Sequence, residues 1–85
     1  MKTYLIKPKT EEAAIPETDM LFYVGDITKL NGKISIRSNA DRVSRRRNTN
    51  WYTDVEYKIV VEGYIIQDHM EKIRSGGYSV REITS

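Results

Sequence analysis

The sequence contains no cysteine and only one histidine, His69, among its 85 residues. Without cysteine, the chain can form neither disulfide bonds nor thiolate metal sites. Metal sites usually combine several histidine, cysteine or carboxylate ligands at regular spacing, and the sequence shows no such set. His69 stands beside Asp68 on a predicted helix, where adjacent side chains point in different directions, so we interpret it as a half-buried helix residue. We therefore expect no catalytic residues, no metal, no cofactor and no enzymatic activity.

Long hydrophobic segments are also missing. No apolar run approaches the ~20 residues that span a bilayer. The apolar stretch within residues 1–8 is too short for a secretory signal. We expect a cytoplasmic protein without membrane contact, folded as one small domain over residues 1–85 with a thin core.

The net charge of +2 conceals an uneven distribution along the chain. Residues 33–52 contain six basic side chains against one acidic side chain, a local charge of +5. Residues 9–26 contain five acidic side chains against one lysine, a local charge of −4. The acidic segment lacks the spacing of a calcium loop and is interpreted as a solvated acidic loop. Such asymmetry bears on partners and association rates, not on fold.

The most informative segment runs from Arg42 to Tyr52. It places four arginines within six positions, and after three further residues come the only tryptophan and a tyrosine. Arginine presents planar, permanently charged donors that match phosphate and carboxylate oxygens, and aromatic rings offer faces for stacking. The candidate binding residues are Lys33, Arg37, Arg42, Arg45, Arg46, Arg47, Trp51 and Tyr52.

Two hydrophobic segments predict a β-hairpin. Residues 20–30 and 33–38 flank Asn31-Gly32, a dipeptide typical of two-residue hairpin turns. This register would place Ile27 opposite Ile36. Before the hairpin, residues 3–7 predict a short strand and residues 8–19 a surface loop with at most one helical turn.

Residues 39–50 allow two structures. Asn39 could cap a short helix, or the strand from Lys33 could continue to Arg47, turn at residues 48–50 and return from Trp51. The turn composition favours the extended hairpin arm, which would display the arginines.

The C-terminal half shows the clearest periodicity. Residues 54–66 alternate like a strand, and a helix of about three turns follows, with an apolar stripe at Ile66, His69, Met70 and Ile73. Gly76-Gly77 ends this helix, and residues 78–83 predict a closing strand. The sequence therefore predicts an α+β fold: a mainly antiparallel sheet of four to five strands with one helix on one face, in the order β-loop-β-β-β-α-β.

Three functions suit this pattern. The favoured hypothesis is a non-enzymatic inhibitor or adaptor that engages an acidic protein surface through Arg42–Tyr52. In size and composition the chain is similar to small accessory proteins of bacteriophages and other mobile elements. The alternatives are a nucleic-acid-binding module that uses the same arginines on phosphates, and an oligomeric binder of a small anionic nucleotide. Exposed strand edges in a thin sheet also make a homodimer conceivable.

Overall fold

The computed structural model describes residues 1–29, 33–43 and 49–83. Four strands form one antiparallel sheet in the order β2-β3-β1-β4, and two helices accompany it. The predicted α+β class with a mainly antiparallel sheet is confirmed, with two helices where the sequence predicted one. The elements are β1 (Lys2–Pro8), α1 (Glu17–Thr28), β2 (Ile34–Ser38), a 3-10 turn η1 (Trp51–Asp54), β3 (Tyr57–Val61), α2 (Gln67–Ser75) and β4 (Tyr78–Ile83).

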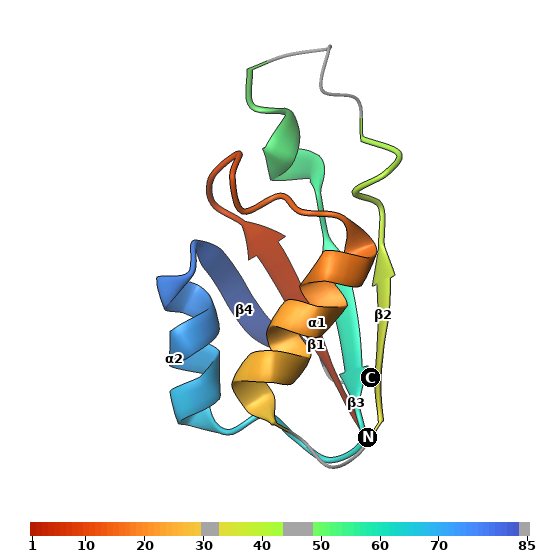
Figure 1. Cartoon of the computed structure of the whole chain (residues 1–85), viewed down its shortest axis with the longest axis vertical. Coiled ribbons are helices and arrows are strands. Elements are labelled where there is room, and N and C mark those ends of the chain that lie inside the picture. The colour runs from red at the N-terminus through yellow and green to blue at the C-terminus, as the bar shows by residue number, and fades with distance from the viewer. Residues whose placement is uncertain (30–32, 44–48, 84–85) are drawn as a thin grey trace.

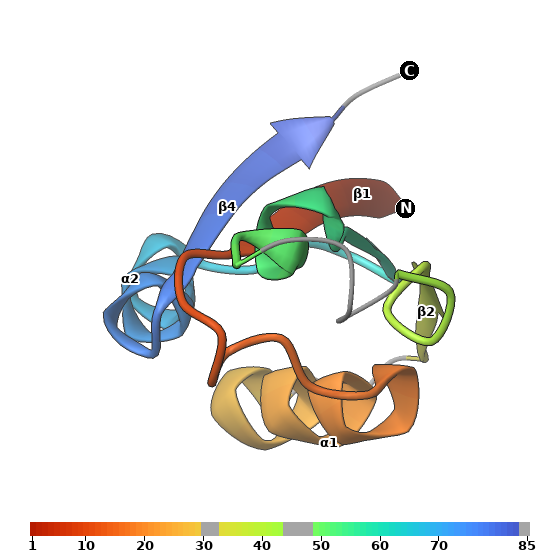
Figure 2. The ribbon, with the colours of Figure 1, turned by 90° about the horizontal axis from the view of Figure 1, so that it is seen from above.

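Both helices cover the same face of the sheet, and the hydrophobic core lies between the two layers (Figures 1 and 2). Apart from η1, the element order β-α-β-β-α-β is that of the ferredoxin-like motif. That motif carries many unrelated functions, so function must be argued from particular residues. Neither described helix has the length and apolar character needed to cross a membrane.

Helix α1 replaces the first strand of the predicted hairpin. Its buried residues Met20, Val24 and Thr28 recur every four positions, which places them on one helical face against the sheet. Pro16 directly precedes the helix, and acidic residues occupy its first turn, as is typical of a helix N-terminus. The predicted strand over residues 20–30 is therefore wrong. In the sequence-based prediction, the β-favouring composition of residues 21–24 was given more weight than these two signals of a helix start.

Strand β2 pairs with β3 instead of with residues 20–30. The observed register sets Ile36 opposite Ile59 and Arg37 opposite Lys58, so the predicted Ile27–Ile36 pair is wrong. The Asn31-Gly32 turn lies outside the described residues. After Ser38 the chain forms a turn in which the Arg42 and Val43 amides both donate to the Asn39 carbonyl, so the extended arm does not form over residues 39–43.

Helix α2 and strand β4 follow the predicted pattern closely. The helix ends before Gly76-Gly77, and Tyr78 and Val80 of β4 face the core. The predicted apolar stripe is correct at Ile73, which is buried, and wrong at Ile66, which is 44% exposed. Its neighbour Ile65 is buried instead, because the chain is still extended before the helix begins at Gln67.

Three of the six tyrosines are core residues. Tyr4, Tyr57 and Tyr78 are buried. The Tyr4 hydroxyl accepts a hydrogen bond from the Ile65 amide, and the Tyr57 hydroxyl donates to the Ile15 carbonyl. Burial raises the pKa of Tyr57 and of Tyr78 to about 12. These rings therefore join the layers and are not available on the surface.

Gly76 is required where α2 meets α1. A Cβ atom at this position would overlap the hydroxyl of Tyr23 on α1. We expect Gly76→Ala to lower the free energy of unfolding by about 1–3 kcal/mol, the usual cost of overpacking. Chemical denaturation of the variant measures this change. Adding Tyr23→Phe should recover part of the loss because it removes the overlapping oxygen; an equal loss in both backgrounds would contradict this explanation.

Candidate binding surface

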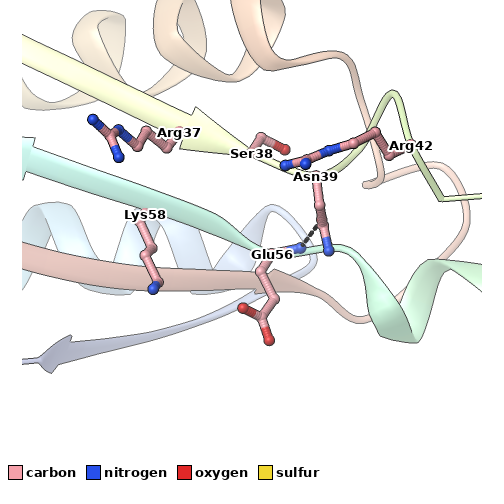
Figure 3. A pocket seen from close by; sticks show the side chains of 6 residues that line it. All are labelled: Arg37, Ser38, Asn39, Arg42, Glu56 and Lys58. Carbon is pink, nitrogen blue, oxygen red and sulfur yellow. Dashed lines mark hydrogen bonds between the residues drawn. The ribbon is translucent and has the colours of Figure 1, made fainter.

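A basic pocket lies where β2 and β3 meet the turn after β2. It has a volume of about 220 Å³ and is lined by Arg37, Ser38, Asn39, Arg42, Glu56 and Lys58. Arg37 and Lys58 are directly paired on neighbouring strands, and Arg42 belongs to the turn. Figure 3 shows the Arg42 side chain directed back along the end of β2, toward the side on which Arg37 lies. We call Arg37, Arg42 and Lys58 the cation cluster.

Hydrogen bonds between side chains and the backbone hold the wall of this pocket in place. The Asn39 side chain donates to the Asp54 carbonyl and accepts from the Glu56 amide, each at 2.8 Å (Figure 3 shows the second bond). It thereby fastens the turn after β2 to the chain entering β3. On the other side, the Ser38 amide donates to the Glu17 carboxylate of α1 at 2.9 Å. Because these bonds attach the backbone at Ser38 and Asn39 to α1 and to the chain entering β3, the backbone that carries the cations is held in one position.

The cation cluster lacks internal counter-charges. Among the described residues, no carboxylate forms an ion pair with Arg37, Arg42 or Lys58. The one carboxylate lining the pocket, Glu56, lies 4.0 Å from the Nζ atom of Lys7. All three cations are exposed, so their donors remain available to an external anion.

The structure separates the sequence-predicted residues into distinct groups. Arg37 and Arg42 lie together at the pocket, whereas Lys33 precedes β2 at its opposite end, where the Lys33 amide donates to the Glu62 carboxylate. Arg45, Arg46 and Arg47 lie outside the described residues.

Trp51 belongs to the core and not to the binding surface. It is only 5% exposed, and its Nε1 atom donates to the Glu11 carboxylate at 3.2 Å. Tyr52 is half-buried and meets the Trp51 ring edge-on, with ring centroids 6.3 Å apart. The expected stacking face of Trp51 is therefore covered. Glu11, which accepts this hydrogen bond from Trp51, belongs to residues 9–26, the segment that the sequence analysis interpreted as a solvated acidic loop.

Sequence reasoning missed Lys58. The sequence does indicate that Lys58 is on the surface, because it alternates with Tyr57 and Ile59 and must face away from the core. Its position beside Arg37 depends on the pairing of β2 with β3, which the hairpin prediction had assigned incorrectly.

Known proteins supply no further guide to this surface. No family model, no curated protein and no solved structure matches the chain. Within the described residues, no group of three or more histidine, cysteine or acidic side chains is arranged to hold a metal ion. The functional argument therefore rests on the cation cluster and its surroundings.

Proposed function

We propose that this protein is a non-enzymatic binding protein, of the inhibitor or adaptor type, that engages an acidic protein surface through the cation cluster. The observation that carries the proposal is the grouping of three exposed cations, unpaired within the described chain, on a fixed backbone frame. Arg45, Arg46 and Arg47 follow Arg42 closely in sequence and add charge to the same stretch of sequence. His69 lies on α2 in the helical layer, apart from this cluster.

A protein surface of mixed charge suits the cluster better than nucleic acid does. None of the described residues lining the pocket is aromatic, so this part of the pocket offers no ring on which a base could stack. Glu56 also contributes a negative charge, which repels a phosphate backbone. A protein surface with mixed charges can pair its own cations with Glu56 and its carboxylates with the arginines.

Charge reversal of the cluster tests this proposal. The variant Arg37→Glu/Arg42→Glu should lose affinity for labelled poly-L-glutamate by about tenfold or more. Each exposed pair contributes ~0.2–1 kcal/mol, and reversal adds repulsion. Fluorescence anisotropy at low and at physiological salt measures the loss, and the wild-type affinity should fall as salt rises.

A matched control carries the same change in net charge elsewhere. Lys29 and Lys72 are exposed and belong to the helical layer, so Lys29→Glu/Lys72→Glu should bind almost as the wild type does. Equal losses in the two variants would show only a net-charge effect. Tighter binding of a labelled single-stranded oligonucleotide would favour a nucleic-acid partner. Either result would contradict the proposal.

A further inference from the structure

The face of the sheet opposite the helices carries a basic row that crosses all four strands. The register places Arg37 opposite Lys58, Lys58 opposite Leu5, and Leu5 opposite Arg81, so these four side chains share one face. Arg37, Lys58 and Arg81 are exposed and Leu5 is half-buried. Both helices pack on the other face (Figure 2), so neither covers this row. We call this surface the open face.

Apolar side chains occupy the middle of the open face. The neighbouring row joins Ser35, Val60, Thr3 and Ile83, and the last three are half-buried. Together with Leu5, Val60 and Ile83 form an apolar strip with Arg37 and Lys58 toward one edge and Arg81 toward the other. An apolar centre with a charged rim is the usual anatomy of a protein interface.

The fold also separates charge between its two layers. Helix α1 carries Glu17, Asp19 and Asp26 and no basic residue. The open face carries five basic side chains along its strands and their approaches, against the acids Glu56 and Glu62. The basic residues are Lys7, Lys33, Arg37, Lys58 and Arg81. A partner with negative charge is therefore attracted to the open face and repelled by α1.

We infer that the open face binds an extended acidic segment of a partner protein, in which one apolar residue is flanked by two carboxylates. This inference rests on the proposed function and extends its surface from the cation cluster to Arg81. Neighbouring strands are about 4.8 Å apart, so Arg37 and Arg81 are separated by about 14 Å. An extended peptide spans about 13 Å between residues i and i+4. A Glu-Xaa-Leu-Xaa-Glu segment that crosses the strands therefore sets its leucine over Leu5 and its carboxylates near the cations on either side.

Two labelled peptides test this inference. One repeats Glu-Ser-Leu-Ser-Glu, and the other replaces each leucine with serine at unchanged charge. The leucine peptide should bind the wild-type protein about fivefold more tightly, because it covers apolar surface on the open face. Leu5→Ser should remove this preference. Arg81→Glu, an exposed change that spares the core, should weaken both peptides several-fold.

The outcomes separate this inference from the proposed function. If Arg37→Glu/Arg42→Glu loses binding while Leu5→Ser and Arg81→Glu bind both peptides as the wild type does, the partner does not cross the open face. The inference is then overturned and the proposed function stands. If none of the three variants changes binding, or if a single-stranded oligonucleotide of equal charge binds more tightly than either peptide, both are overturned. Circular dichroism of Leu5→Ser confirms that the variant is folded.

Discussion

Replacement of Ile65 by aspartate is expected to unfold the protein. Ile65 is 2% exposed and lies in the core between the sheet and the start of α2, where its amide donates to the buried Tyr4 hydroxyl. A carboxylate there must either lose its hydration or take up a proton, at a cost of several kcal/mol. Small domains have free energies of unfolding near the lower end of ~5–15 kcal/mol, so this loss removes most of the stability. Circular dichroism and urea denaturation measure it.

The adjacent residue provides a matched control. Ile66 is 44% exposed and directly precedes α2, so Ile66→Asp should change the free energy of unfolding by less than about 1 kcal/mol. The sequence pattern placed Ile66 on the buried stripe and would predict the larger loss there. A stable Ile65→Asp variant together with an unfolded Ile66→Asp variant would mean that the observed start of α2 is wrong.

Trp51→Ala is the second change with a large expected effect. Removing a buried tryptophan leaves a cavity and typically costs ~3–5 kcal/mol. It also leaves the Glu11 carboxylate without the indole donor at 3.2 Å. We expect a variant that is largely unfolded at room temperature, measured by circular dichroism and by its urea midpoint relative to the wild type.

Trp51→Phe separates packing from hydrogen bonding at the same position. The phenyl ring keeps most of the buried apolar area but cannot donate to Glu11, so the expected loss is only about 1–2 kcal/mol. If Trp51→Ala instead kept its stability and lost affinity for poly-L-glutamate, Trp51 would belong to the binding surface, as the sequence alone suggested.

The C-terminal half of the fold was predictable because its periodicity is strong and local. Tyr57, Ile59 and Val61 alternate with the less buried Lys58 and Val60, and Gly76-Gly77 marks the end of a helix. In the N-terminal half, the strands over residues 3–7 and 33–38 were predicted, but helix α1 was not, because residues 20–24 form a continuous apolar run that suits a buried strand or a buried helix equally well. In a strand, Phe22 and Asp26 would share one face with Met20, Val24 and Thr28. The structure buries the latter three and exposes Phe22 and Asp26, which fits a helix and not a strand.

The sequence predicted that the candidate site is basic, but it did not predict all of the residues that form it. Arg37 and Arg42 were identified from the basic run, and they do lie together. Lys58 and Arg81 join them only through the strand order β2-β3-β1-β4, which depends on long-range pairing and leaves no local signal. Trp51 was predicted to bind a ligand, and its position after the arginines gave no indication that it is buried.

The surface formed by the cation cluster and the open face is expected to bind carboxylates of a partner protein. The most direct measurement is an NMR titration of isotope-labelled protein with poly-L-glutamate, followed by backbone amide shifts. We predict that the shifting amides cluster on the four strands and the turn after β2, around Arg37, Arg42, Lys58 and Arg81, while those of α1 and α2 stay unchanged. Shifts confined to the helices, or no shifts even at low salt, would contradict the claim.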